Sequence, residues 1–268
     1  MKGRVLIVAG SDSGGGAGIQ ADIKSVTALG GFAMTAVTAL TAQNTRGVHG
    51  VFGVDTAFVA QQMRVVLDDL GADAIKTGML HNVDVIETVA RELDAVPEIP
   101  LVADPVMVAK GGARLLDDGA HDALGALLLP RATVLTPNAP EAAALTGIEV
   151  SDEDGQKRAA EKLLEMGVAA ALVKGGHVDG DEVVDLLVTR DETVRFADSR
   201  IDSAHTHGTG CTLASSIAAG LAQEMSLTDA VARARRYVRA AILSAPGYGG
   251  GHGPLDHGVT VDPSQLSG

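Results

Sequence analysis

The sequence contains very few residues that form cross-links or large aromatic clusters. Its 268 residues include one cysteine, Cys211, no tryptophan and only 2% aromatic residues. A single cysteine forms no internal disulfide and cannot build a cysteine-rich zinc site. The sequence therefore excludes a secreted scaffold held by disulfides. Its core must be filled by small and branched aliphatic residues, which suit a buried parallel sheet covered by helices.

Basic residues are also scarce, with 21 Lys and Arg against 34 Asp and Glu and a formal net charge of -13. This acidic balance argues against a nucleic-acid-binding surface, which needs clustered Lys and Arg. No apolar segment approaches the ~20 residues of a membrane-spanning helix. The apolar run at residues 5–9 is too short for a signal peptide. We therefore expect a soluble, cytoplasmic protein with neither a nucleic-acid nor a membrane partner.

Short β-branched runs alternate with amphipathic patterns along the chain. The predicted strands are 5–9, 32–40, 74–77, 101–103, 133–136 and 170–174, with a hairpin at 182–188 and 193–196. The predicted helices are 19–29, 56–70, 83–93, 119–129, 152–166, 212–223 and 228–243, and an irregular tail starts at Pro246. Asp55 is placed to cap the second helix and Gly71 to end it. The alternation predicts an α/β fold with a mostly parallel sheet. With no repeat and no linker, residues 1–268 form a single predicted domain.

Ligands of open α/β sheets bind beyond the carboxyl ends of the strands. The first strand is followed by residues 10–18, which contain five glycines. Such a loop lets backbone N–H groups approach a ligand, next to a helix N-terminus. It lacks the Lys of a GxxxxGK[ST] motif. Residues 16–21 fit GxGxxA, but this match begins well beyond the strand end, so a dinucleotide site is disfavoured.

Two polar residues lie near this loop. Asp22, in the first turns of the next helix, either lies on an exposed helix surface or points back at a ligand. Gln43 follows the second strand and carries both a donor and an acceptor, as the edge of a heterocycle requires. The alternative for Gln43 is a loop amide that bonds to backbone.

The later strand ends carry groups suited to phosphate and Mg²⁺. Asp104 follows a buried strand, where an oxygen ligand for Mg²⁺ is useful. Asn138 and Glu141 either form a capping box or hold Mg²⁺ and phosphate. Lys174 precedes two glycines and is placed to reach phosphate.

The segment 205–212 precedes a predicted helix that is rich in small and apolar residues. Gly208, Thr209 and Gly210 offer successive N–H donors, which predicts an anion hole for a phosphoryl group. Cys211 lies at the helix N-terminus, where we expect its pKa to be lowered. The alternative is a small buried Cys that packs the helix. His205 and His207 complete no metal-ligand set.

Five motifs occur along the sequence, at residues 9–22, 41–45, 104–106, 138–141 and 207–212. Together they resemble the hydroxymethylpyrimidine (phosphomethylpyrimidine) kinases of thiamine biosynthesis, nearly end to end. The resemblance implies a ribokinase-like, three-layer αβα sandwich. It also implies the use of ATP and Mg²⁺ to phosphorylate 4-amino-5-hydroxymethyl-2-methylpyrimidine and then its monophosphate. The family suggests homodimers.

The resemblance also implies site residues. Those for the pyrimidine are Gly10, Asp22, Gln43, Met79 and Val106. Those for ATP are Asn138, Lys174 and Thr206, and those for the metal are Asp104 and Glu141. The catalytic group comprises Gly208, Thr209, Gly210 and Cys211.

Cys211 departs from most ribokinase relatives, which carry Asp at this position as a general base. Cys211 either removes the proton late or positions the substrate, and a loose phosphoryl-transfer transition state tolerates both. Two other functions remain open: a pyridoxal or pyridoxamine kinase of the same fold, and a non-catalytic binding protein for a pyrimidine or nucleotide.

Overall fold

The structure is a computed structural model and describes residues 2–107 and 119–262. Within these residues it contains one nine-stranded sheet in the order β3-β2-β1-β4-β5-β6-β7-β8-β9. The strands are β1 (Arg4–Asp12), β2 (Phe32–Asn44), β3 (Gly47–Gly53), β4 (Ala74–Thr77), β5 (Leu101–Ala103), β6 (Val134–Leu135), β7 (Ala170–Val173), β8 (Glu182–Thr189) and β9 (Thr193–Ser199). The helices are α1 (Gly18–Ala28), α2 (Thr56–Asp69), α3 (Val83–Asp94), α4 (Ala120–Ala123), α5 (Ala139–Thr146), α6 (Glu153–Glu165), α7 (Thr209–Ala222) and α8 (Leu227–Leu243).

The central part of the sheet is parallel, from β2 through β7, and β3, β8 and β9 are antiparallel additions at its edges. The strand order changes direction beside β1. The chain first goes to β2 on one side of β1 and later to β4 on the other side. Such a switch point opens a crevice beyond the carboxyl ends of the strands.

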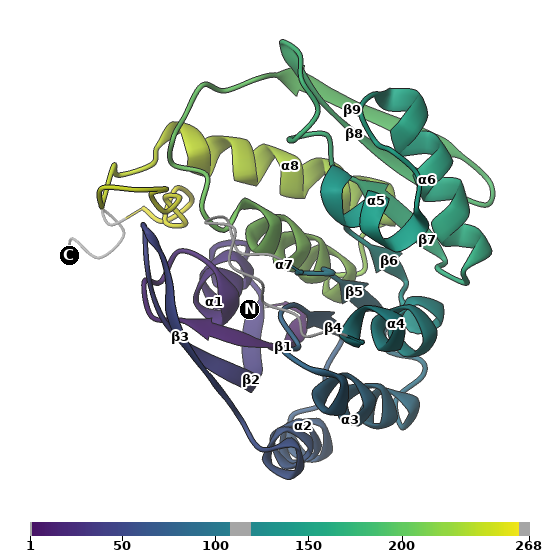
Figure 1. The fold of residues 1–268 in the computed structure, drawn as a ribbon. Coiled ribbons are helices and arrows are strands. Elements are labelled where there is room, and N and C mark those ends of the chain that lie inside the picture. The colour runs from purple at the N-terminus through teal and green to yellow at the C-terminus, as the bar shows by residue number, and fades with distance from the viewer. Residues whose placement is uncertain (1, 108–118, 263–268) are drawn as a thin grey trace.

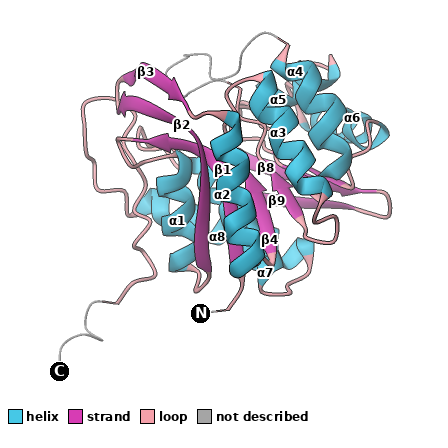
Figure 2. Cartoon of the chain, turned by 90° about the horizontal axis from the view of Figure 1, so that it is seen from below, coloured by secondary structure: helices cyan, strands magenta, loops and turns pink. Residues whose placement is uncertain are grey.

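Helices cover both faces of the sheet (Figure 1). α1, α7 and α8 lie on one face, and α2 to α6 lie on the other. Figure 2 shows the strands lengthwise, with α2 and α3 in front of the sheet. The alternation of β1 divides the core, since Val5 and Ile7 pack against α7 while Leu6 and Val8 pack on the opposite face. All four are fully buried, and each contributes on the order of 2 kcal/mol by leaving water. The expected three-layer αβα sandwich is confirmed.

Most predicted elements are present near their predicted positions. Asp55 caps α2 by accepting a hydrogen bond from the Ala57 N–H at 2.9 Å. Gly71 adopts a left-handed φ of +67° just beyond the helix. Within the described residues no helix has both the length and the apolar character needed to cross a lipid bilayer.

Three predictions of local structure are wrong in detail. β3 was not expected, because the glycines within Gly47–Gly53 obscure its alternation. The predicted helix 119–129 is a short α4, followed by a π-helical turn over Leu124–Leu128 and a 3₁₀ turn. α7 begins at Thr209 and not at residue 212. The prediction placed this start too late because glycines on both sides of Thr209 are typical of a loop. In the irregular tail, residues 263–268 lie outside the described part of the chain.

Candidate active site

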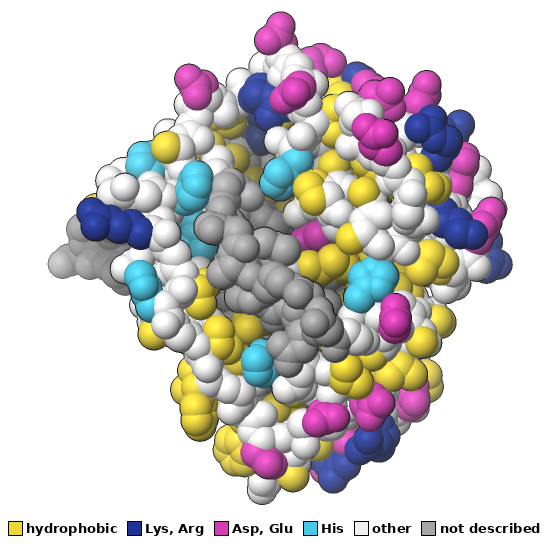
Figure 3. Space-filling view, viewed as in Figure 1, with side chains coloured by type: hydrophobic (Ala, Val, Ile, Leu, Met, Phe, Trp, Pro, Cys, Tyr) yellow, Lys and Arg dark blue, Asp and Glu magenta, His cyan; other side chains and the backbone are white. Residues whose placement is uncertain are grey.

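A pocket of about 870 Å³ opens beyond the carboxyl ends of the central strands. This volume lies in the range of ligand sites in proteins. Figure 3 shows that charged side chains lie mostly along the outer edge of this face of the molecule, whereas histidine, apolar and uncharged groups surround its centre. Two parts of the pocket differ in chemistry. The glycine-loop end comprises residues 10–12, 17 and 18 of the loop with Gln43, Lys76 and Met79. The Lys174 end comprises Asp104, Asn138, Glu141 and Lys174.

The carboxylate of Asp12 fixes the conformation of the glycine loop, residues 10–18, through hydrogen bonds. It accepts hydrogen bonds from the N–H groups of Gly14 at 2.7 Å, Gly16 at 3.2 Å and Ala17 at 2.8 Å, and His207 Nε2 lies 2.8 Å from Oδ2. Burial opposes ionisation, but these hydrogen bonds hold the pKa of Asp12 below its usual value. The loop is therefore preformed. Asp12 was not predicted as a site residue, although an Asp before glycines is typical of such a turn.

Four predicted pyrimidine-site residues line the pocket: Gly10, Gln43, Met79 and Val106. A Cβ at Gly10 would lie only 3.0 Å from Met79 Sδ, so the glycine lets the methionine lie close against β1. The amide of Gln43 lies 3.3 Å from His207 Nε2 and 3.1 Å from Thr41 Oγ1. The structure thus brings an apolar surface and an amide to the same end.

Asp22 does not lie in the wall of this pocket. Its carboxylate is fully buried, pairs with Lys76 Nζ at 2.9 and 3.0 Å, and accepts a hydrogen bond from Ser215 Oγ at 2.6 Å. Lys76 lines the pocket, so Asp22 reaches it only through this lysine. Burial opposes ionisation of Lys76, but the carboxylates of Asp22 and Asp104 hold its pKa above the usual value. Lys76 was missed because nothing local to a four-residue strand indicates a partner 54 residues away.

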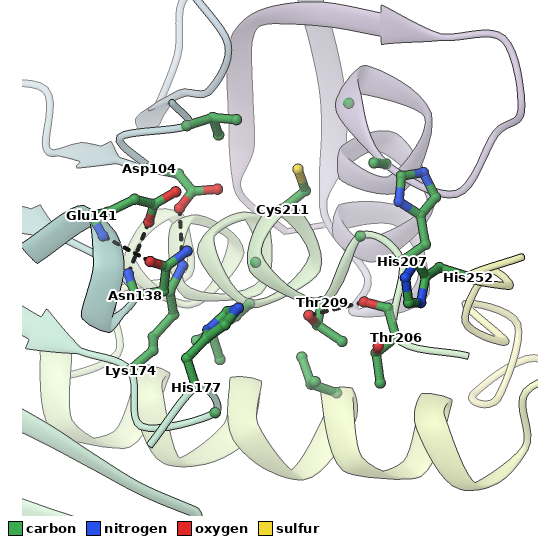
Figure 4. Close-up of a pocket in the computed structure, with 18 of the residues that line it drawn as sticks. Asp104, Asn138, Glu141, Lys174, His177, Thr206, His207, Thr209, Cys211 and His252 are labelled. Atoms are coloured by element: carbon green, nitrogen blue, oxygen red, sulfur yellow. Dashed lines mark hydrogen bonds and ion pairs between the residues drawn. The ribbon is translucent and has the colours of Figure 1, made fainter. Parts of the chain in front are cut away.

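The Lys174 end gathers acidic groups around one lysine (Figure 4). Lys174 Nζ lies 3.2 Å from Asp104 Oδ1, which also accepts a hydrogen bond from Thr136 Oγ1 at 3.1 Å. Asn138 and Glu141 form a capping box at the start of α5, with hydrogen bonds of 2.8 and 2.9 Å. Burial, with a smaller contribution from Asp104, raises the pKa of Glu141 to about 7 although Lys174 lies nearby. The capping box and a role toward phosphate are therefore compatible, because Glu141 and Asn138 also line the pocket.

Asp104 and Glu141 suit a magnesium ion that takes two ligands from the protein and most of its ligands from water and phosphate oxygens. In the part of the chain that the structure describes, no three His, Cys, Asp or Glu side chains gather into a complete metal site. Mg²⁺ commonly takes one or two protein carboxylates and completes its shell with water and phosphate. The carboxylate of Asp104 raises the cost of ionising Glu141, and a cation between the two groups would relieve this repulsion. These two residues fit such a cation.

The N-terminus of α7 lies between the two ends of the pocket. Gly208 precedes α7 with φ +85°, and a Cβ there would overlap the carbonyl oxygen of Gly16. A Cβ at Gly210 would lie 3.3 Å from Lys174 Nζ, so this glycine lets the lysine approach the backbone. Thr209 Oγ1 donates to the Thr206 carbonyl at 3.2 Å, and both residues line the pocket. The first N–H groups of a helix lack intrahelical partners, which makes this turn suitable for an anion.

The expected low pKa of Cys211 is wrong. Burial raises the pKa of this thiol to about 12, and the carboxylates of Asp22 and Asp104 add to the rise. Lys76 opposes the rise but does not overcome it. Cys211 is half-buried, and Figure 4 shows it at the start of α7. At neutral pH it is therefore a thiol, not a thiolate.

Apolar residues of β8, α7 and α8 line a further part of the pocket. They are Val183, Leu213, Val238 and Ile242, and Arg239 lies with them. The sequence did not identify them as site residues, because they belong to segments that have the ordinary apolar pattern of a core. The pocket is thus larger than one pyrimidine ring requires.

The fold and this divided pocket define a ribokinase-like small-molecule kinase, and solved structures agree. Pyridoxal kinase from Staphylococcus aureus in complex with pyridoxal has a TM-score of 0.90 and 33% identity, over 97% of this chain and 95% of that chain. Phosphomethylpyrimidine kinase from Clostridium difficile has a TM-score of 0.81 and 38% identity, over 90% of this chain and 100% of that chain.

Sequence relatives identify the family more narrowly. The model of the phosphomethylpyrimidine kinase family matches residues 12–256, and the chain belongs to this family. A hydroxymethylpyrimidine/phosphomethylpyrimidine kinase of Streptomyces coelicolor is 52% identical over 95% of this chain and 94% of that protein. A thiamine biosynthesis bifunctional protein of Geobacter sulfurreducens is also 52% identical, over 96% of this chain. The chain spans about half the length of that protein, with 52% covered.

Proposed function

We propose that the protein transfers the γ-phosphoryl group of ATP to the hydroxymethyl group of 4-amino-5-hydroxymethyl-2-methylpyrimidine, and then phosphorylates the monophosphate to the diphosphate. These are steps of thiamine diphosphate biosynthesis in the cytoplasm. The observation that carries the proposal is the pocket itself. Apolar side chains and the amide of Gln43 lie at one end, a lysine with two carboxylates lies at the other, and the N-terminus of α7 lies between them.

ATP binds with its phosphates at the Lys174 end beside Asn138, and Thr206, next to Thr209, contacts the nucleotide from the wall of the same pocket. Asp104 and Glu141 hold Mg²⁺, which neutralises charge on the phosphate oxygens when it is bound. Lys174 contacts the transferred phosphate. The N–H groups of Gly208, Thr209 and Gly210 receive the charge that develops during transfer. Catalysis of phosphoryl transfer consists mainly of such positioning and charge stabilisation.

The pyrimidine binds at the glycine-loop end. Gln43 pairs with the polar edge of the ring, and Met79 and Val106 flank its faces beside Gly10. Cys211 faces the acceptor hydroxyl. Because burial keeps this thiol protonated, Cys211 orients the hydroxyl and does not act as a strong base. A loose transition state needs little proton removal before the new bond forms, so a neutral positioning group suffices.

A second candidate is pyridoxal phosphorylation, which the likeness to the Staphylococcus aureus pyridoxal kinase favours. ADP formation with Mg²⁺, measured for the pyrimidine alcohol, its monophosphate and pyridoxal, separates the possibilities. We expect turnover with both pyrimidines and a lower kcat/KM for pyridoxal. A higher kcat/KM for pyridoxal would identify a pyridoxal kinase. Tight pyrimidine binding without any turnover would instead indicate a binding protein.

We also propose that the protein is a homodimer. Apolar side chains are exposed along the β2–β3 hairpin and α2, with Phe52 70% and Phe58 55% exposed. Clustered exposure of this kind is typical of association surfaces. Sedimentation equilibrium should give twice the chain mass, and a monomer at micromolar concentration would contradict the proposal.

A further inference from the structure

Lys174 lies directly beyond the point where β7 and β8 stop pairing. The ladder between these two strands ends at the pair of Val173 and Leu186. Just after the lysine, Gly175 passes so close to β8 that a Cβ on it would overlap the carbonyl oxygen of Val184. The regular pairing of β7 with β8 therefore stops at Lys174, and the backbone groups on either side of the lysine need other partners.

Hydrogen bonds fix the backbone on both sides of this lysine. The N–H of Lys174 donates to the carbonyl oxygen of Pro137 at 2.9 Å. The N–H of the next residue, Gly175, donates to Oδ1 of Asp185 on β8 at 2.8 Å. The amide of Gln156 on α6 donates to one carbonyl oxygen of each strand, at 3.0 and 2.9 Å. The peptide group that follows the lysine is thus held by a charged side chain, the carboxylate of Asp185.

The carboxylate of Asp185 is itself held by a buried arginine. Asp185 is only 6% exposed, so its charge needs a buried partner of opposite sign. Arg235 of α8 donates from Nη1 to Oδ2 of Asp185 and from Nη2 to Oδ2 of Asp198, the latter at 2.9 Å. The guanidinium carbon of Arg235 also lies 5.8 Å from the centre of the Phe196 ring. One oxygen of Asp185 therefore serves Gly175 and the other serves Arg235, so the carboxylate cannot turn without losing a partner.

We propose that Asp185 is a positioning residue for Lys174, and that Arg235 holds its carboxylate in the orientation that this role requires. The inference rests on the proposed function, in which Lys174 contacts the transferred phosphate. At its far end the lysine is held by Asp104, 3.2 Å from Nζ (Figure 4), and at its near end by the peptide group that Asp185 binds. Without Asp185 this peptide group is free to turn, and Nζ shifts relative to the phosphate. A displacement of about 1 Å at such a group costs about 10²-fold in rate.

The test is a double-mutant cycle between Asp185 and Lys174, because Asp185 also lines the pocket and could contact the nucleotide directly. The quantity measured is kcat/KM for ATP with Mg²⁺ at saturating pyrimidine. We expect Asp185→Ala to lower it by ~10²-fold, with the KM of the pyrimidine unchanged. In the Lys174→Met protein the same substitution should lower it by less than about threefold, because the group that Asp185 positions is gone. Asp198→Ala is the matched control. It removes the half-exposed carboxylate that pairs with Arg235, leaves the hydrogen bond to Gly175 in place, and should change kcat/KM by less than about twofold.

A purely structural role or a direct nucleotide contact for Asp185 gives a different pattern. If Asp185→Ala lowers kcat/KM by the same factor in both backgrounds, or if Asp198→Ala lowers it as much, the inference is overturned while the kinase activity stands. Asp185→Ala combined with Arg235→Met removes both charges of the buried pair, and it replaces the single variant in the cycle if that variant does not fold. If no pyrimidine is phosphorylated, the proposed function fails. The affinity for a non-hydrolysable ATP analogue with Mg²⁺, measured by calorimetry, then replaces kcat/KM in the cycle. Equal losses in the two backgrounds, or no binding by the unaltered protein, overturn the inference.

Discussion

The two ends of the pocket satisfy their polar groups in different ways. At the glycine-loop end, Asp12 is surrounded by N–H donors, and the buried Asp22 neutralises Lys76. At the Lys174 end, two carboxylates share one lysine, and Glu141 has a pKa raised to about 7. Under the proposed function, the first end is preorganised for the pyrimidine ring, and the second is completed by the nucleotide and its cation.

This difference explains why a chain with a net charge of -13 can bind an anionic nucleotide. Charged side chains lie mostly along the outer edge of the face that Figure 3 shows. In the pocket, Lys174 and the N-terminus of α7 supply positive potential at short range. Net charge is therefore a poor guide to the ligand, because exposed charges are screened over about 10 Å.

The largest effect should come from the Lys174 end. Lys174→Met removes the cation beside Asp104, so we expect kcat/KM for ATP to fall by ~10³-fold while pyrimidine binding is retained. Lys162→Met is the matched control, since Lys162 is exposed and pairs with Glu165 on α6. Steady-state kinetics at saturating pyrimidine measure the change. A loss below tenfold would mean that Lys174 does not contact the transferred phosphate.

A smaller effect should follow at the boundary between the two ends. Cys211→Ala removes the group that orients the acceptor hydroxyl, so kcat should fall by at least ~10²-fold with little change in the KM of ATP. Cys211→Ser keeps a hydrogen-bonding group and should lose less. An unchanged kcat in Cys211→Ala would assign this residue to helix packing alone.

The pKa of the same thiol provides a third test. Since burial raises it to about 12, iodoacetamide should alkylate Cys211 about 50-fold more slowly at pH 8 than it alkylates the unfolded chain. The rate should still be rising above pH 10. Because the chain has one cysteine, mass spectrometry follows this reaction without interference. A plateau reached below pH 9 would show that the helix N-terminus and Lys76 outweigh burial.

The same pKa has a consequence for stability. The unfolded chain ionises Cys211 near pH 9, whereas the folded chain keeps it protonated. The contribution of this thiol to stability is therefore present below pH 9 and is lost as the pH rises toward 12.

The sequence predicted the central strands well, because each is a short buried run followed by a helix. The segments Ala74–Thr77 and Leu101–Ala103 are strands with the predicted limits. It failed for β3 and for the start of α7, where glycine hides the periodicity on which such predictions depend.

The sequence predicted those site residues that directly follow a strand, because the end of the strand fixes where they lie in the sheet. Asp104 and Lys174 follow parallel strands, so both had to lie at the same edge of the sheet. The Asp22–Lys76 pair and the Asp12–His207 contact were not predictable, because they join segments 54 and 195 residues apart. The pKa of Cys211 was predicted in the wrong direction for a related reason. The helix N-terminus is local, but the burial and the carboxylates that outweigh it come from the tertiary fold.

The most direct test of the divided pocket measures two dissociation constants in three proteins. Calorimetry should give the affinities for the pyrimidine alcohol and for a non-hydrolysable ATP analogue with Mg²⁺. Gln43→Ala should weaken the pyrimidine by ~10-fold and leave the nucleotide unchanged, since only the ring edge loses its partner. Lys174→Met should do the reverse. If Gln43→Ala weakens the nucleotide as much as the pyrimidine, the two ends do not bind separate ligands and the account is contradicted.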